Sequence, residues 1–388
     1  MFSKETYTNR RKRLKSKINS GIALFMGNVD VGMNYTDNTY HFRQDSTFLY
    51  FFGLDYQGLA GLIDFESGEE ILFGDDFTID DIIWMGPQPR LKDNAAKVGV
   101  TATHSSSKLN SFINEAISQG RKIHFTPPYR GKNIIKLSEL LHILPAQVKE
   151  QASLTLLNTC IALRSIKEPC EIEEMERHTL TAYRMHTTAM KMAQVGNTEQ
   201  QITGMVEGIS MSGGGMVSFP VICSVRGETL HNHYHGNTLK QGDLLLLDAG
   251  SESPLHYATD HTRTSPVGGK FTPKQKEIYQ IVLDANNHAL AATKPGISYK
   301  EVHLLAARTI ASGLKDLGLM KGNVDEAVSV GAHALFIPHG LGHMIGLDVH
   351  DMEDYGDTLV GYDEETPRST QFGLAALRLA AVCKLTLL

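Results

Sequence analysis

The chain has 388 residues, more than a single hydrophobic core usually serves, so we expect two domains. Its 37 basic and 43 acidic residues give a formal net charge of −6, which favours no nucleic-acid partner. The 4 cysteines form no Cys-x-x-Cys pair, and neither a membrane-length apolar segment nor a secretory leader is present, so we expect no membrane partner and a location in the reducing cytoplasm.

The amino-terminal part of the chain has the pattern of an α/β domain. Arg10-Arg11-Lys12-Arg13 is interpreted as the solvated face of a first helix. Burial in the core is one interpretation of Trp84, the single tryptophan. The expected elements, in chain order, are a helix at 9–18, strands at 22–26 and 47–52, a hairpin of 59–65 with 70–73, a helix at 107–119 and a strand at 122–125.

A domain boundary is expected near residues 159–165, which gives an amino-terminal domain at 1–160 and a second domain at 161–388. The four residues from Ser165 to Glu168 have a capping-box pattern, and Pro169 suits the first turn of a helix. A long helix is therefore predicted from this point to about Ala193.

Two aspartates follow apolar or β-rich segments in the second domain. The run Leu244–Leu247 predicts a buried parallel or central strand, and Asp248 ends it. An ionised carboxylate there is costly unless it is paired or bound to a cation. Residues 250–254 predict a turn, so the returning segment would bring Asp260 toward the same point. The alternative is that Asp248 caps a turn and Asp260 pairs with Arg263.

Histidines cluster in two further segments. His339, His343 and His350 are interspersed with glycines, which disfavour a regular helix and allow close approach to a ligand. Imidazole binds metals and transfers protons near neutral pH, although any one of these rings could also be structural. In 230–235, the alternating histidines His231, His233 and His235 are in strand register. We expect one of them to reach the point where Asp248 and Asp260 meet and the others to lie on a solvated edge.

Several segments together resemble one family, the metallopeptidases of the pita-bread fold, in the Xaa-Pro aminopeptidase and prolidase branch. The resemblance implies an α+β protein of two domains, a smaller creatinase-like α/β amino-terminal domain and a pita-bread catalytic domain that is truncated at its carboxy-terminal end. The segments that carry it are LLLLDAG, ATDHTRTSPVGGKFTPKQKEIY, KPGISYKEV and HGLGHMIGLDVHD within 161–350, and YHFRQDS at 40–46.

The resemblance also implies a chemistry for the site. Asp248 would be a terminal ligand of one metal ion, Asp260 would bridge two ions, and His343 would bind the second. His231, His339 and His350 would be the catalytic histidines that steady the substrate carbonyl, the intermediate and the departing proline segment. Two divalent ions are implied, and carboxylate-rich ligation favours manganese. The implied substrates are peptides with proline in second position, and the implied assembly is a homodimer or a higher homo-oligomer. In a dimer of this family, the alternative to core burial is that Trp84 lines the substrate mouth of the neighbouring subunit.

The chain departs from the family pattern in two places. Neither of the two glutamate ligands that follow the family's histidine ligand is found; Glu353, Glu364 and Glu365 lie in a polar stretch with the composition of a loop. We therefore expect an incomplete catalytic domain, from truncation or a frameshift, or else a natural pseudo-enzyme, with severely weakened metal binding. The spacing from Asp248 to Asp260 is one residue longer than usual, which predicts a longer turn around Pro254.

Three functional hypotheses remain open. The first is a metal-dependent aminopeptidase that acts before proline and is impaired in this chain. The second is a metal-free, creatinase-like amidinohydrolase in which histidine acts as acid and base. The third is a non-catalytic pseudo-enzyme. Retention of both aspartates and His343 favours the first.

Overall fold

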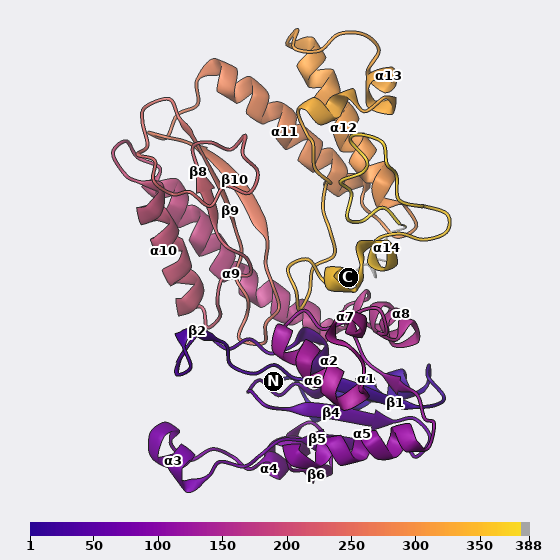
Figure 1. The fold of residues 1–388 in the computed structure, drawn as a ribbon. Helices are drawn as coiled ribbons and strands as arrows, with labels where there is room; N and C mark the ends of the chain where they lie inside the picture. The colour runs from indigo at the N-terminus through magenta and orange to yellow at the C-terminus, as the bar shows by residue number, and fades with distance from the viewer. Residues whose placement is uncertain (382–388) are drawn as a thin grey trace. The chain divides into compact units, whose positions relative to one another are not determined.

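The computed structural model describes residues 1–381 and divides the chain into two compact units, Met1–Arg164 and Ser165–Leu388 (Figure 1). Each unit contains both helices and strands. The first has a five-stranded sheet and the second a three-stranded sheet.

The sheet of the first unit has the order β6-β5-β4-β1-β7. β1 pairs antiparallel with β4 and parallel with β7, and β5 pairs antiparallel with β4 and parallel with β6. The predicted strand at 22–26 and the predicted hairpin are therefore confirmed. The strands are β1 (Ile22–Met26), β4 (Ala60–Asp64), β5 (Glu70–Phe73), β6 (Ala102–His104) and β7 (Ile123–His124), and β2 (Gly32–Tyr35) and β3 (Asn38–Thr39) form a separate ribbon.

Helices pack against this sheet through an apolar core. Ile113 of α5 and Leu137 of α6 are buried in one cluster with Leu24 and Leu62 of the sheet. The predicted helix at 107–119 corresponds to α5. The helices of the unit are α1 (Lys4–Lys15), α2 (Ser46–Phe52), α3 (Ile79–Met85), α4 (Leu91–Lys97), α5 (Leu109–Ser118), α6 (Gly131–Leu141), α7 (Pro145–Val148) and α8 (Leu154–Arg164).

The strand predicted at 47–52 is wrong, because this segment forms helix α2. The Asp45 side chain accepts a hydrogen bond from the backbone N–H of Phe48, and Gly53, with φ +61°, ends the helix in the left-handed region. All seven side chains of α2 are buried. A short helix that is buried all round has no amphipathic periodicity, so its aromatic composition favours a strand when only the sequence is considered.

The interpretation of the basic run as a solvated face is wrong for two of its members. Arg10 and Arg11 are buried, with exposed fractions of 1% and 0%. Arg10 donates to the carbonyl of Tyr50 at 3.1 Å, and Arg11 donates to the carbonyl of Phe51 at 2.7 Å. These carbonyls lie in the last turn of α2, where the helix itself supplies no N–H partner. The two guanidinium groups therefore satisfy the buried end of α2.

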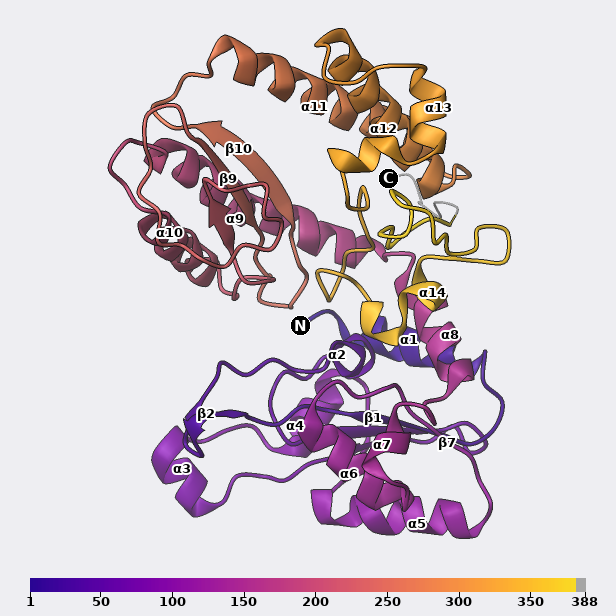
Figure 2. The same cartoon turned by 45° about the horizontal axis from the view of Figure 1, so that its top comes forward.

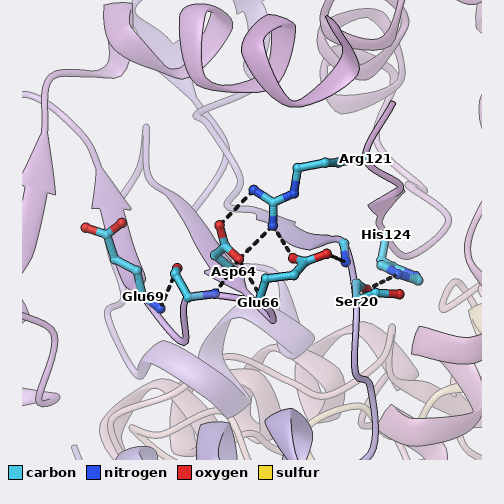
Figure 3. A network of polar contacts seen from close by, with 8 residues as sticks. Ser20, Asp64, Glu66, Glu69, Arg121 and His124 are labelled. Atoms are coloured by element: carbon cyan, nitrogen blue, oxygen red, sulfur yellow. Dashed lines mark hydrogen bonds and ion pairs between the residues drawn. The ribbon is translucent and has the colours of Figure 1, made fainter. Parts of the chain in front are cut away.

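A polar network ties the turn between β4 and β5 to neighbouring segments (Figure 3). Arg121 donates to the two carboxylate oxygens of Asp64 at 2.7 and 2.9 Å and also to Glu66, which accepts from the backbone N–H of Gly21 at 2.7 Å. Burial by itself would raise the pKa of Asp64, but the hydrogen bonds from Arg121 and from the N–H groups of Ser67 and Glu66 hold that pKa well below its usual range. The network therefore holds the turn between β4 and β5 against the segments that precede β1 and β7.

The second unit combines an antiparallel sheet of order β10-β9-β8 with helices. Side chains of α9 and α10 share a core cluster with β9, and α9 runs along the sheet (Figure 2). α11 and α12 pack on each other. The elements are α9 (Pro169–Met192), α10 (Glu199–Ser212), β8 (Ile222–Ser224), β9 (Leu244–Ala249), β10 (His261–Pro266), α11 (Pro273–Ala292), α12 (Tyr299–Asp316), α13 (Val324–Ser329) and α14 (Asp357–Val360).

The predicted long helix is present as α9, but it begins later than its expected cap. Pro169 is its first residue, and Glu168 is the N-cap in place of Ser165. The backbone N–H of Glu168 donates to the Glu171 carboxylate at 2.8 Å. The helix ends at Met192, next to the predicted end at Ala193. Proline suits the first helical position, where no N–H partner is needed, and this sets the start.

Two histidines are buried together between α12 and the short helix Ala332–Leu335. His303 and His333 have exposed fractions of 0% and 1%, and their ring centroids are 5.9 Å apart. The Nε2 atom of His303 lies 3.2 Å from the carbonyl of Gly373, to which it donates as a neutral ring. Burial, with a smaller contribution from His333, lowers the pKa of His303 to about 4.

The second unit is therefore expected to lose stability in mild acid. A histidine with a lowered folded pKa stabilises fully above its unfolded pKa, near 6.5, and this contribution is lost as the pH falls toward 4. The expected loss from His303 between pH 7 and pH 5 is about 2 kcal/mol. Urea unfolding of His303→Leu should show a smaller difference between these pH values than the unaltered chain. The exposed His288 provides the control, because His288→Gln should leave the pH dependence unchanged. An equal pH dependence in His303→Leu and the unaltered chain would contradict this assignment.

Candidate active site

The antiparallel pair β9–β10 positions the first candidate carboxylate. Asp248 lies opposite Thr262 of β10 on one side and Ile222 of β8 on the other, so β9 is the central strand, as predicted. Leu245 and Leu247 are buried in the cluster shared with α9 and α10. Alternate residues of a strand point to opposite faces, which directs Asp248 to the other face of the sheet.

The connection between β9 and β10 contains a turn that follows Pro254. The N–H of Ser253 donates to the carbonyl of Tyr257 at 2.8 Å, and His256 has φ +67°, a left-handed conformation that is uncommon for a residue with a Cβ. Side chains of helix α9 hold this connection in place through hydrogen bonds. Its contacts are His178 Nε2 with Ser251 Oγ at 2.8 Å, His186 Nε2 with the carbonyl of Ala249 at 3.0 Å, and Tyr257 Oη with Glu171 Oε1 at 2.8 Å.

The second candidate carboxylate contacts the candidate histidine. His343 Nε2 lies 3.1 Å from Asp260 Oδ2, and Nδ1 lies 2.9 Å from the carbonyl of Met344, to which it donates. The loop that carries His343 is held by a hydrogen bond from Ala258 N–H to the carbonyl of Gly346 at 2.8 Å. Burial lowers the pKa of His343, but Asp260 and the Met344 carbonyl outweigh that effect and raise it. The Nδ1–H bond to the Met344 carbonyl fixes the ring in the way that is usual for a metal-ligating imidazole and leaves Nε2 as the nitrogen available to an ion.

Asp248 is close enough to this pair to interact with it electrostatically. Burial raises its pKa, the charge of Asp260 raises it further, and Thr262, His231 and His343 oppose the shift. Its Oδ1 atom is buried and has no hydrogen-bond partner among the described residues. The alternative pairing of Asp260 with Arg263 is not observed, because Arg263 donates to the carbonyl of Thr262 and is exposed.

We expect Asp248→Asn to stabilise the metal-free protein by about 1 kcal/mol at neutral pH. A carboxylate whose folded pKa is raised costs stability above its unfolded pKa, and the amide removes that cost. Urea unfolding in the presence of a chelator at pH 7 measures the effect. Asp316→Asn, at an exposed aspartate of α12, should change the free energy of unfolding by less than about 0.5 kcal/mol. Destabilisation by Asp248→Asn under these conditions would contradict the account of a buried, unpaired oxygen.

The three candidate catalytic histidines have different surroundings. The His350 ring stacks on His343, with centroids 3.8 Å apart, and its Nδ1 pairs with Glu353 at 2.9 Å. His231 is exposed and influences the pKa of Asp248. His339 is exposed, and its Nδ1 donates to the carbonyl of Gly340 at 2.9 Å. The structure thus places His350 against His343 and His231 within electrostatic range of Asp248, whereas His339 has no such contact among the described residues.

The strand predicted at 230–235 is wrong, because this segment is part of an irregular loop between β8 and β9. The alternation of histidines does not produce a strand here, because polar side chains of the loop form hydrogen bonds with residues in and next to β8. Asn232 donates to Ser224 Oγ at 3.1 Å, and His235 Nε2 lies 3.1 Å from the carbonyl of Val221. His235 therefore has a local structural contact.

Glu353 belongs to the site, although its sequence context assigns it no role. Burial would raise its pKa, but the hydrogen bond and charge of His350 outweigh this and lower it. Its Oε1 atom is buried and has no hydrogen-bond partner among residues 1–381. The spacing of three residues from His350 was the available signal, and it carries little weight in a segment predicted as a loop.

The fit of the site to metal ions is incomplete. Within residues 1–381, no group of three or more His, Cys, Asp or Glu side chains is arranged to hold a metal ion. Asp260 and His343 provide two donors in contact, and Asp248 adds a buried oxygen nearby. The described residues therefore do not fit a complete two-metal centre.

Comparison with known protein families accounts for both units. Residues 173–370 match the model of metallopeptidase family M24, and residues 7–124 match that of the aminopeptidase P N-terminal domain. The chain belongs to metallopeptidase family M24. This membership confirms the two-domain α+β fold, with an aminopeptidase P-like amino-terminal domain and an M24 catalytic domain. Membership of metallopeptidase family M24 implies that divalent metal ions serve as cofactors.

The relatives of this M24 chain include proline-specific peptidases. It is 32% identical to the Xaa-Pro aminopeptidase of Escherichia coli over 92% of this chain and 83% of that protein. It is 30% identical to the human Xaa-Pro dipeptidase over 95% of this chain and 75% of that protein. The enzyme class, an Xaa-Pro aminopeptidase-type metallopeptidase, follows from these similarities.

Solved structures give the same result. The zinc-substituted E. coli aminopeptidase P in complex with product has a TM-score of 0.80 and 29% identity, covering 94% of this chain and 86% of that one. Aminopeptidase PepP of Pseudomonas aeruginosa has a TM-score of 0.81 and 27% identity, covering 90% of this chain and 81% of that one. Across residues 1–381, the M24 chain has no helix with the length and hydropathy needed to span a bilayer.

Proposed function

We propose that this chain is an Xaa-Pro aminopeptidase that cleaves the peptide bond between an amino-terminal residue and a following proline, and that its activity is impaired. The observation that carries the proposal is the Asp260–His343 contact beside Asp248 on the central strand of an M24 domain. A proline peptide bond has no N–H and a fixed φ, so extended-substrate proteases accommodate it poorly and a dedicated site is needed.

The proposed metal ligands are Asp248, Asp260 and His343. Two divalent ions, with manganese as the preferred metal for carboxylate-rich ligation, would supply an activated water and polarise the substrate carbonyl. Two features of the chain support these roles. Oδ1 of Asp248 is an acceptor without a donor, and Nδ1 of His343 is fixed by the Met344 carbonyl so that Nε2 points at Asp260.

The proposed catalytic residues are His231, His339 and His350. Histidine can donate a hydrogen bond to a developing oxyanion and return a proton to a leaving group. The stacking of His350 on His343 and the interaction of His231 with Asp248 support places near the reacting groups. For His339 the support is the family resemblance of its segment.

Impairment follows from the incomplete ligand set. The two glutamates of the family pattern are not recognisable, and the described residues do not assemble three metal-ligating side chains. Hard divalent ions are retained by the number, charge and geometry of their oxygen ligands. Weak metal retention, and with it weak hydrolysis, is the expected consequence.

A metal-free amidinohydrolase is the second candidate, and one observation favours it. The pKa of His343 is raised by Asp260 and the Met344 carbonyl, against the opposing effect of burial, as a general acid requires. The two candidates differ in their response to metal. Hydrolysis of an Xaa-Pro peptide that rises with added manganese and is lost in both Asp260→Ala and His343→Ala supports the first. Activity on an amidino substrate that a chelator leaves unchanged supports the second. Loss of neither activity in the two variants would exclude this pair as the reactive centre.

The assembly and the location are proposed from Trp84 and from the cysteines. The core-burial interpretation of Trp84 is wrong, because its exposed fraction is 86% and α3 has no buried residue. Such an apolar helix supports a homodimer or higher homo-oligomer. The free cysteines Cys160 and Cys223 support a cytoplasmic location, and the proposed domains are 1–160 and 161–388.

A further inference from the structure

Glu199, the first residue of α10, has a fully buried carboxylate that is surrounded by donors. Its exposed fraction is 0%. Both oxygens accept hydrogen bonds from N–H groups of two residues. These are Val225 N at 2.7 Å, Asn237 N at 3.1 Å, and Asn237 Nδ2 at 3.1 Å to Oε1 and 3.0 Å to Oε2.

The two partners of Glu199 are the two ends of one loop. Residues 225–237 follow β8 and precede β9, and His231 lies midway between Val225 and Asn237. Backbone bonds support the same closure, because Glu199 N–H donates to the carbonyl of Asn237 at 3.1 Å and Gln200 N–H donates to that of His235 at 3.0 Å. One side chain therefore joins both ends of the loop to the start of a helix.

The closed loop and the buried carboxylate depend on each other energetically. A carboxylate that is removed from water is tolerated only when its oxygens are hydrogen-bonded, and the amino terminus of α10 adds a favourable dipole. If either end of the loop left, Glu199 would remain buried with unfilled acceptors, which is more costly than the loss of an ordinary hydrogen bond. The tip can therefore be exposed while its ends stay fixed.

We propose that Glu199 is a positioning residue that clamps both ends of loop 225–237 and so fixes the position of His231 at the middle of that loop. Only the catalytic use of His231 rests on the proposed function. The clamp itself is a property of the fold and can be measured without substrate or metal.

Hydrogen exchange and a donor–acceptor swap test the clamp. Glu199→Gln places an amide against the donors of Asn237, so amides of loop 225–237 should exchange at least about tenfold faster, while those of α9 and β9 keep their rates. Asn237→Asp alone should have a similar effect, because two carboxylates then face each other. The double variant Glu199→Gln/Asn237→Asp restores a complementary side-chain pair but still leaves the backbone N–H of Val225 or of Asn237 facing the amide NH2 of the glutamine, so it should restore slow exchange only in part.

A spectroscopic readout tests the placement of His231. Its imidazole NMR signals should change on Asp248→Asn in the otherwise unaltered chain, and this response should be lost in the Glu199→Gln background. Unchanged loop exchange in Glu199→Gln, equal acceleration throughout the second unit, no restoration in the double variant, or no His231 response to Asp248→Asn would each overturn the proposal. The absence of peptidase activity would contradict the proposed function but would not affect the interpretation of these exchange and NMR measurements.

Discussion

The purified chain is expected to retain less than one equivalent of manganese and to hydrolyse an Xaa-Pro peptide about 100-fold or more slowly than the E. coli relative. The reason is the ligand set. Disturbing even the residues that support metal ligands costs 10–100-fold in affinity or activity, and here ligands themselves are unaccounted for among the described residues. Metal content after dialysis and turnover with added manganese measure both quantities.

A fusion provides the matched control for this expectation. The chain, joined in frame to the carboxy-terminal strands of the E. coli aminopeptidase, should regain metal binding and Xaa-Pro hydrolysis. The same fusion with His343→Ala should regain neither, although circular dichroism should show that its fold is preserved. Full metal occupancy and high turnover in the unfused chain would show that the ligands have been assigned to the wrong residues.

Arg11→Met is expected to lower the free energy of unfolding of the first unit by about 3–5 kcal/mol. The guanidinium of Arg11 is fully buried. It donates hydrogen bonds to the Glu70 carboxylate and to the carbonyls of Phe51 and Val98, each at 2.7 Å. Methionine fills much of the volume but leaves these buried acceptors without donors. Urea unfolding followed by circular dichroism measures the change.

Two variants separate hydrogen bonding from net charge. Lys12→Met removes one positive charge from the exposed neighbouring position and should cost less than about 0.5 kcal/mol. Arg11→Lys keeps the charge, but an ammonium cannot reach all three acceptors, so its cost should be intermediate. Equal stability of Arg11→Met and Lys12→Met would show that the buried hydrogen bonds contribute nothing.

The prediction from sequence succeeded where residue chemistry or local pattern decides the structure. The strand that carries Asp248 and the turn before Asp260 follow from an apolar run and turn residues. It failed at α2 and at Arg10 and Arg11. In both cases the deciding factor is burial between elements distant in sequence, which removes helical periodicity in one case and brings charged side chains to buried carbonyls in the other.

The same division applies to the site. The sequence by itself determined the family and the residue types of the candidate ligands Asp248, Asp260 and His343, because these depend on residue type and order. Only the tertiary structure decided that Glu353 joins His350, that His231 lies on a loop clamped by Glu199, and that Asp248 has a buried oxygen without a donor. These features depend on which distant backbone and side-chain groups meet in space, and local sequence pattern does not encode those meetings.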